Sequence, residues 1–151
     1  MKTILLAEDY DEDAKCFSMV LESAGVASQV IRVKDGLEAI AYLEGKPPYD
    51  DRTKFPFPDV VMIDLKMPRV DGFEVLEWVK KNVTNKLLPV VLSGHDEVNA
   101  IQHAYALGAA TFLVKPCHPQ DVRNLTKTYS DYFTLTPGAT TTETEERETS
   151  F

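Results

Sequence analysis

Two patterns of hydrophobic and polar positions alternate along the chain. Short continuous apolar runs are typical of strands buried on both faces of a sheet, whereas apolar residues three and four positions apart are typical of helices. The runs predict five strands, at residues 3–7, 26–33, 59–64, 88–93 and 111–115. Helical spacing follows each run, as in the first helix with Ala14, Phe17, Val20, Leu21 and Ala24. This alternation predicts an α/β fold with a parallel sheet and right-handed crossovers.

Residues with special backbone preferences mark where several helices begin and end. Gly25 follows the first helical pattern and suits a helix C-terminus. Asp35 precedes the second pattern and is of a preferred N-cap type. Pro119 suits the first position of the last helix, whose pattern runs to Phe133. The strand over 26–33 is more polar than the others, which predicts a place near an edge of the sheet.

Two segments do not fit the alternation. Residues 45–58 contain four prolines and two phenylalanines, so this long loop is either functional or an insertion. Residues 134–151 are rich in Thr and Glu and cannot bury enough apolar surface to offset the entropy of ordering. The expected organisation is a folded domain over 1–133 and a disordered tail over 134–151, which is either an inert end or a tether for a partner.

Composition and charge exclude several classes of function. The net charge of −8 argues against binding to nucleic acid or to an anionic membrane surface, because both favour basic patches. No apolar run approaches the roughly 20 residues of a membrane span, and acids follow the opening MKTILLA at once, unlike in a signal peptide. Cys16 and Cys117 have no spacing typical of a disulfide framework or a metal site. These features predict a cytoplasmic protein with reduced thiols.

Polar residues end four of the five predicted strands. Glu8 and Asp9 follow the first strand, and Asp64 ends the third. Ser93 ends the fourth strand and Lys115 the fifth. In doubly wound sheets, ligands bind at the carboxyl ends of the strands, where strand order reverses. A strand order of 2-1-3-4-5 would place the first and third strands side by side, and with them the three carboxylates.

The residue types in this predicted crevice suit a metal ion and a phosphoryl group. Three carboxylates close together cannot all stay ionised without a cation, and an all-oxygen set selects a hard ion such as Mg²⁺. Lys115 and Ser93 would then bind the oxygens of a phosphoryl group under attack by a carboxylate. Each residue alone has an ordinary explanation, as a helix N-cap, a turn residue or a solvated strand end. The joint pattern at four strand ends favours the functional interpretation.

Five stretches of the sequence resemble the receiver domain of two-component response regulators. They are ILLAEDYDEDA, VKDGLEAI, DVVMIDLKMPRVDGFEVL, LPVVLSGHDE and GAATFLVKP. The resemblance spans residues 3–133 and implies a flavodoxin-like, doubly wound (βα)5 three-layer sandwich. Among receivers, the chain is most similar to the short stand-alone regulators of bacterial phytochrome histidine kinases. These too often carry a Glu-Asp acid pair and a proline-rich segment before the third strand.

The resemblance implies a role for each residue at the strand ends. Asp64 would be the phosphoacceptor, receiving a phosphoryl group from the phosphohistidine of a sensor histidine kinase. Ser93 and Lys115 would bind the phosphoryl oxygens, and Ser93 and Phe112 would act as the conformational switch. The ligands that it implies for Mg²⁺, with Mn²⁺ as a substitute, are Glu8 (largely through water), Asp9, Asp64 and the backbone carbonyl of Lys66.

The resemblance also implies how the signal leaves the domain. Phosphorylation would draw Ser93 toward the phosphoryl group and let Phe112 turn inward. This would change the surface formed by the fourth helix, the fifth strand and the fifth helix. Since no residues remain for an output domain, we expect a protein contact, either a homodimer through this surface or docking back on the kinase. The chain would be no enzyme beyond its own phosphotransfer and autodephosphorylation.

The sequence departs from the commonest receiver pattern at a few positions. Glu8 stands where aspartate is more usual, and Phe112 where tyrosine is often found. Lys66 and His95 each lie two residues after a site residue and would flank the route of an attacking water. We hypothesise that they prolong the life of the phosphorylated state; the alternative is that both are solvent-facing loop residues. The dipeptide Lys115-Pro116 matches a position where receivers usually place a cis peptide.

Three other functions fit the residues less well. A phosphatase with an aspartyl nucleophile would need a second acid two residues after Asp64, where the chain has Lys66. A dinucleotide or flavin binder would need a glycine-rich loop after the first strand, where the chain is acidic. A receiver that acts as a scaffold without phosphorylation stays open as an alternative, although all five site positions carry chemically competent residues.

Overall fold

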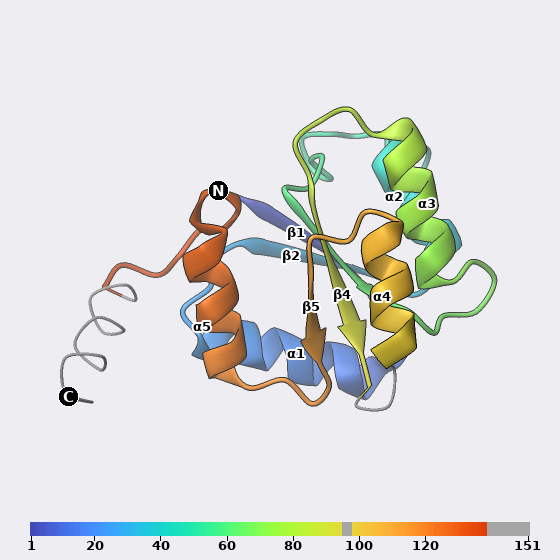
Figure 1. The fold of residues 1–151 in the computed structure, drawn as a ribbon. Coiled ribbons are helices and arrows are strands. Elements are labelled where there is room, and N and C mark those ends of the chain that lie inside the picture. The colour runs from blue at the N-terminus through green and yellow to red at the C-terminus, as the bar shows by residue number, and fades with distance from the viewer. Residues whose placement is uncertain (95–97, 139–151) are drawn as a thin grey trace.

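The computed structural model describes residues 1–94 and 98–138, which form five strands and five α-helices (Figure 1). The strands are β1 (Thr3–Ala7), β2 (Gln29–Val33), β3 (Val60–Asp64), β4 (Leu88–Ser93) and β5 (Thr111–Val114). The helices are α1 (Asp11–Ser23), α2 (Gly36–Glu44), α3 (Gly72–Asn82), α4 (Val98–Ala106) and α5 (Pro119–Thr128). A short 3₁₀ helix, η1 (Ser130–Tyr132), follows α5.

The strands form one parallel sheet in the order β2-β1-β3-β4-β5. This order confirms the predicted α/β fold and the place of the second strand at an edge. Because β1 and β3 are neighbours, Ala7 lies opposite Ile63, one residue before the acids that follow each of them. The sheet itself therefore brings the two acidic strand ends together.

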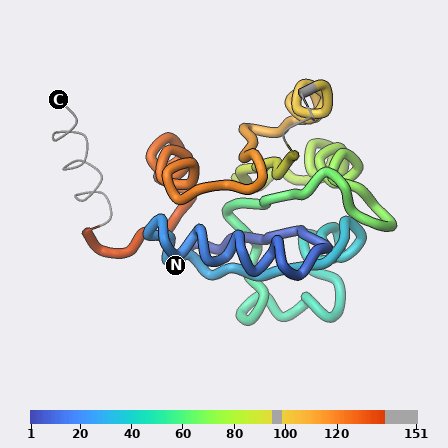
Figure 2. Tube along the Cα trace, turned by 90° about the horizontal axis from the view of Figure 1, so that it is seen from below, coloured from blue at the N-terminus to red at the C-terminus, as the bar shows by residue number. Residues whose placement is uncertain are grey.

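Helices cover both faces of the sheet and make three layers (Figures 1 and 2). Helices α1 and α5 pack on one face, and α2, α3 and α4 pack on the other. Alternate residues of β1 serve the two faces, since successive side chains of a strand point in opposite directions. Ile4 and Leu6 belong to the core under α1 and α5, whereas Leu5 and Ala7 belong to the core under α2 to α4.

The ends of the helices largely follow the predicted signals. Gly25 has the left-handed φ of 86° after α1, and the Asp35 side chain accepts a hydrogen bond from the backbone of Glu38 as the N-cap of α2. Helix α5 starts at Pro119 as expected but ends at Thr128, before the predicted Phe133. The chain turns into η1 there, which still leaves the Phe133 side chain buried in the core.

The proline-rich loop over 45–58 is packed against α2 rather than extended into solvent. Tyr42 of α2 is fully buried, its ring lies 5.1 Å from that of Tyr49, and its hydroxyl donates to the carbonyl of Pro56. Arg52 donates to the carbonyls of Leu43 and Phe55, at 3.0 Å each. The loop thus closes over α2 through an aromatic cluster and an arginine.

The folded unit continues beyond the predicted boundary at residue 133. The backbone of Thr134 exchanges hydrogen bonds with Ala27 and the Ser28 side chain, and Leu135 forms an antiparallel bridge with Val26. Composition alone did not reveal this pairing, because it joins residues 106 positions apart in the chain. The second strand begins at Gln29 and not at residue 26, because Gln29 pairs with Thr3, the first residue of β1. Residues 139–151 of the predicted tail lie outside the described residues.

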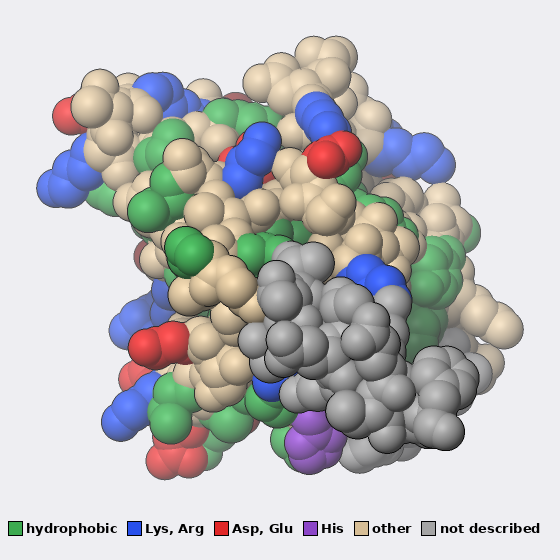
Figure 3. All heavy atoms as spheres, turned by 90° about the vertical axis from the view of Figure 1, so that its left-hand side faces the viewer, with side chains coloured by type: hydrophobic (Ala, Val, Ile, Leu, Met, Phe, Trp, Pro, Cys, Tyr) green, Lys and Arg blue, Asp and Glu red, His purple; other side chains and the backbone are tan. Residues whose placement is uncertain are grey.

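The described surface mixes side chains of different kinds. On the face that includes α5 and the N-terminus, lysine and arginine side chains lie among acidic and apolar ones (Figure 3). Within residues 1–94 and 98–138, each helix is too short or too polar to cross a membrane.

Candidate functional site

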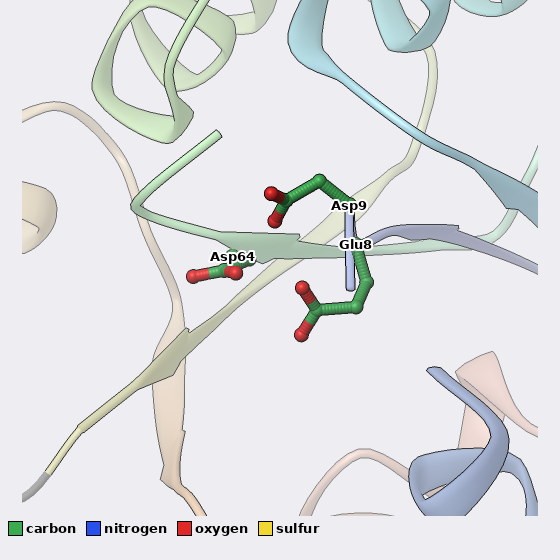
Figure 4. A group of neighbouring side chains, drawn as sticks. All are labelled: Glu8, Asp9 and Asp64. Atoms are coloured by element: carbon green, nitrogen blue, oxygen red, sulfur yellow. The ribbon is translucent and has the colours of Figure 1, made fainter. Parts of the chain in front are cut away.

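Three carboxylates meet at the carboxyl edge of the sheet. Glu8 and Asp9 come directly after β1, and Asp64 is the last residue of the neighbouring β3. One oxygen of each lies within 4.8 Å of the others, and Figure 4 shows the three carboxyl groups gathered at the ends of these strands. The fold therefore unites the three acids that the sequence suggested as metal ligands.

Lys115 is the cation of this group. Its Nζ donates to Glu8 Oε1 at 2.6 Å and to Asp64 Oδ2 at 3.1 Å, and it also lies 3.4 Å from Asp13 Oδ2. The peptide bond from Lys115 to Pro116 is cis, as the sequence suggested. The lysine thus bridges the ends of β1 and β3 from the position just after β5.

Burial and neighbouring charge shift the proton affinity of these groups. Glu8 is only 1% exposed, and its burial, together with the adjacent Asp64 carboxyl, raises the pKa of Glu8 to about 7. Lys115 opposes that shift, but it does not cancel it. Burial alone would lower the pKa of Lys115, yet the carboxylates of Glu8 and Asp64 raise it above its ordinary value. Lys115 therefore stays charged at neutral pH, while Glu8 binds a proton more readily than an ordinary glutamate.

Ser93 contributes a buried hydroxyl at the end of the strand next to β3. It ends β4, the neighbour of β3, and its carbonyl accepts a hydrogen bond of 2.7 Å from the backbone of Lys115. The residue is 1% exposed, and its Oγ has no hydrogen-bond partner among the described residues. An unpaired buried hydroxyl lowers the stability of the folded state by about 1–3 kcal/mol. A ligand that accepts a hydrogen bond from Ser93 Oγ would remove this penalty.

The other predicted site residues are Lys66, Phe112 and His95, and the structure describes the first two. The Lys66 backbone N–H donates to Asp64 Oδ1 at 3.1 Å, which places its main chain beside the acids. Phe112 is half-buried on β5, with its ring edge-on to Tyr105 of α4 at 6.2 Å between centroids. His95 lies outside the described residues. The roles of these residues as carbonyl ligand, switch and flanking group stay predictions.

Two residues at the site, Asp13 and Arg32, were missed by sequence reasoning. Asp13 of α1 reaches Lys115 across 102 positions of the chain, and no spacing pattern signals such a contact. Arg32 of β2 donates from Nε to the backbone carbonyl of Glu8 at 3.0 Å and from Nη1 to Asp11 at 2.7 Å. The predicted strand order could have indicated Arg32, because β2 lies next to β1.

The donor set fits a hard divalent cation. Its three side chains offer carboxylate oxygens, without histidine or thiolate, and such sets suit Mg²⁺ or Mn²⁺ rather than zinc. Burial and, to a lesser extent, the adjacent Asp64 carboxyl raise the pKa of Glu8, and a divalent ion would favour its charged form.

Comparison with known proteins identifies the family. The sequence profile described as "Response regulator receiver domain" matches residues 4–127. The chain belongs to the response regulator receiver family. It is thus a receiver domain of two-component signalling, as its sequence motifs suggested.

Similar receivers include response regulators of bacteria, among them one of red light signalling and one of a phytochrome. Response regulator Rcp1 of a Synechocystis species is 33% identical over 80% of this chain and 81% of its own length. The solved response regulator RPA3017, "in red light signaling of R. palustris", is 31% identical with a TM-score of 0.78, covering 89% of this chain and 98% of that one. The phosphorylated cyanobacterial phytochrome response regulator RcpA is 32% identical with a TM-score of 0.74, covering 89% and 97%.

A metal-bound relative has also been solved. The Mn²⁺-bound form of Rcp1 has a TM-score of 0.73 and 28% identity to this receiver, over 89% of this chain and 99% of that one. In this chain, Glu8, Asp9 and Asp64 form a group of carboxylates that could hold a metal ion.

Proposed function

We propose that this receiver takes a phosphoryl group onto Asp64 from the phosphohistidine of a sensor histidine kinase, in a Mg²⁺-dependent reaction. The main support for the proposal is that Lys115 Nζ contacts both Asp64 and Glu8. Asp64, which can act as a nucleophile, thus lies next to a cation and to two other carboxylates that could hold a metal ion. The phosphorylated cyanobacterial relative gives further support.

In the proposed reaction, an oxygen of Asp64 attacks the phosphorus atom of the phosphohistidine. The O–P bond forms as the P–N bond breaks, and the imidazole keeps the electron pair and takes up a proton. Lys115 compensates the charge of one phosphoryl oxygen, and the unpaired Ser93 hydroxyl donates to another. Glu8, Asp9, Asp64 and the carbonyl of Lys66 would hold Mg²⁺, which supplies positive charge to the phosphoryl oxygens.

Loss of the phosphoryl group would follow from attack of water on phosphorus, which breaks the new O–P bond and restores the Asp64 carboxylate. We propose that the side chains of Lys66 and His95 slow this water, since Lys66 lies two residues after Asp64 and its backbone N–H donates to the Asp64 carboxylate. Unchanged phosphate lifetimes in Lys66→Ala and His95→Ala would show that both are ordinary loop residues.

The signal would pass through the surface of α4, β5 and α5. Phe112 joins the buried side of this surface to Tyr105, which is exposed on α4. A groove of about 340 Å³ runs between β5 and α5 and is lined by Phe112 and Tyr129 among others. We propose that phosphorylation changes this surface and so controls a homodimer or docking on the kinase. Light scattering of the protein with and without phosphodonor would measure the change in mass.

The similarity to RcpA and RPA3017 suggests a phytochrome-type kinase as the partner. The two free thiols, Cys16 and Cys117, suit action in the reducing cytoplasm. Transfer of labelled phosphate from a purified phytochrome kinase to the receiver would test the pairing, with a kinase of another input class as the comparison.

The central test uses Mg²⁺ and acetyl phosphate with the full chain. We expect one phosphoryl group per molecule, labile to hydroxylamine and absent in Asp64→Asn. Asp59→Asn is a matched control, because Asp59 lies just before the other end of β3 and accepts a hydrogen bond from the Thr3 backbone. If neither acetyl phosphate nor any candidate kinase phosphorylates the protein, a phosphorylation-independent scaffold becomes the better interpretation.

A further inference from the structure

The loop between β3 and α3, residues 65–71, contains an unusual arginine. Arg69 has a φ of 66°, in the left-handed region that residues other than glycine and asparagine rarely adopt. Its guanidinium donates through Nε, at 2.9 Å, and through Nη2 to the same oxygen of Asp35, at the start of α2. The strained backbone conformation is therefore held by a two-pronged contact with another element.

Asp35, the partner of Arg69, is also held in place by contacts of its own. It is only 6% exposed, and its second oxygen caps α2 by accepting from the Glu38 backbone at 2.8 Å. Next to it, the Gly36 N–H donates to the carbonyl of Val70 at 3.1 Å. A Cβ at Gly36 would lie 2.1 Å from that carbonyl oxygen, so only glycine allows this close approach. Helix α2 and the loop are thus joined by side chains and by backbone.

The same loop carries a proposed ligand of the metal. Lys66, whose carbonyl would bind Mg²⁺, follows Asp64 and donates its N–H to the Asp64 carboxylate at 3.1 Å. The loop closes where Gly72 N–H donates to the carbonyl of Leu65, again at 3.1 Å. Lys66 lies between this closure and Arg69, so the position of its carbonyl depends on both ends of the loop.

We propose that Arg69 and Asp35 form a clasp that positions the Lys66 carbonyl for metal binding. They are positioning residues, because neither contacts the acidic cluster directly. The inference rests on the proposed function, since it assumes that this receiver binds Mg²⁺ at Asp64. Through this clasp, the start of α2 helps to set the affinity of the site for Mg²⁺.

A purely structural pair would behave differently. The Arg69 side chain is 56% exposed, and exposed ion pairs contribute at most about 1 kcal/mol to stability. A structural role therefore predicts a small loss of stability and unchanged metal affinity. A clasp predicts a clear loss of affinity, because partners that orient metal ligands typically affect binding by about tenfold or more.

The test measures Mg²⁺ binding by calorimetry in the full chain. Arg69→Asn removes the guanidinium but keeps a residue that tolerates the left-handed backbone. Asp35→Ser removes the carboxylate from Arg69 but keeps an N-cap for α2. We expect each to raise the Kd for Mg²⁺ about tenfold and to speed hydrogen exchange at the Gly36 and Lys66 amides without metal. Phosphorylation should recover at saturating Mg²⁺, since the acids and Lys115 are intact.

Arg123→Asn is the control, because Arg123 is an arginine of α5 that contacts Gln120 on its own helix. It should leave Mg²⁺ affinity and both amides unchanged. Wild-type affinity and exchange in Arg69→Asn and Asp35→Ser would overturn the clasp while leaving the proposed function intact. A wild-type chain that binds no Mg²⁺ would overturn both.

Discussion

Lys115 Nζ lies 2.6 Å from Glu8 Oε1, although two strands, β3 and β4, separate β5 from β1 in the sheet. The lysine side chain crosses the carboxyl ends of these strands and reaches the most deeply buried acid of the site. In the metal-free protein it is the counter-charge for Glu8 and Asp64. A divalent cation would compete with it for the same carboxylates.

Replacement of Lys115 by alanine should therefore separate metal binding from stability. Without metal, we expect unfolding free energy to fall by about 2 kcal/mol, less than for a fully buried pair because 26% of the lysine side chain is exposed. We expect Mg²⁺ to bind more tightly, since no internal cation competes, and to restore much of the stability. Chemical denaturation with and without Mg²⁺ measures both effects.

The control for this prediction is Lys81→Ala, which breaks an exposed pair with Glu77 on α3. It should change stability by less than about 0.5 kcal/mol and leave metal affinity alone. Weaker Mg²⁺ binding in Lys115→Ala would show that the lysine organises the acids rather than competing for them.

Ser93→Ala should stabilise the unphosphorylated protein and impair its reaction. The variant removes a buried hydroxyl that has no partner in the described structure, so we expect unfolding free energy to rise by about 1 kcal/mol. Phosphorylation by acetyl phosphate should slow, because a donor to the phosphoryl group is lost. Denaturation curves and phosphorylation rates, measured on one preparation, test the two effects together.

Thr126→Val gives a matched comparison for Ser93. The Thr126 hydroxyl is also buried but donates to the carbonyl of Arg123 at 3.0 Å. Its loss should lower stability and leave the phosphorylation rate unchanged. If Ser93→Ala were as destabilising as Thr126→Val, Ser93 Oγ would have a partner in solution, such as an ordered water.

Much of the fold and of the acidic site could be predicted because both follow from local patterns. Apolar runs located the strands, helical spacing located the helices, and the polar residues that end four strands became neighbours once the strand order was set. Glu8, Asp9 and Asp64 needed no knowledge of side-chain packing to be grouped, only the adjacency of β1 and β3.

Contacts between distant side chains could not be predicted in the same way. Asp13 reaches Lys115 and Arg69 reaches Asp35 because helices and loops approach at particular angles, which hydrophobic patterns do not encode. The same holds for Thr134, whose backbone pairs with a segment more than 100 positions earlier. Its polar surroundings in the sequence suggested disorder, whereas its carbonyl accepts a hydrogen bond of 2.7 Å from the Ala27 N–H.

The loop over 45–58 should contribute stability rather than chemistry. Arg52 holds it to α2 through the carbonyls of Leu43 and Phe55 and lies over the Tyr42 ring. We expect Arg52→Ala to lower unfolding free energy by about 1–3 kcal/mol and leave the phosphorylation rate unchanged. Lys54→Ala, which removes an exposed cation over a single ring, should have a smaller effect. A slowed reaction at unchanged stability would instead assign the loop a functional role.

The pH dependence of the free energy of unfolding should reveal that the pKa of Asp35 is lowered in the folded protein. Its burial alone would raise the pKa of the carboxyl, but the hydrogen bonds from the Glu38 backbone and from Arg69 bring the pKa below its ordinary value of 3.8. The folded state therefore binds this proton less readily than the unfolded state. The stability that ionised Asp35 contributes is complete above pH 3.8 and is lost as pH falls from there through the folded-state pKa.

Asp35→Asn isolates this contribution, because asparagine can still cap α2 but cannot ionise. The difference in unfolding free energy between wild type and variant should be constant at higher pH and shrink below pH 3.8. Other carboxyl groups titrate in both proteins, so their effects largely cancel in the difference. Denaturation curves from pH 3 to pH 7 provide the measurement. A difference that stayed constant with pH would mean that the hydrogen bonds from Glu38 and Arg69 do not lower the pKa of Asp35 in solution.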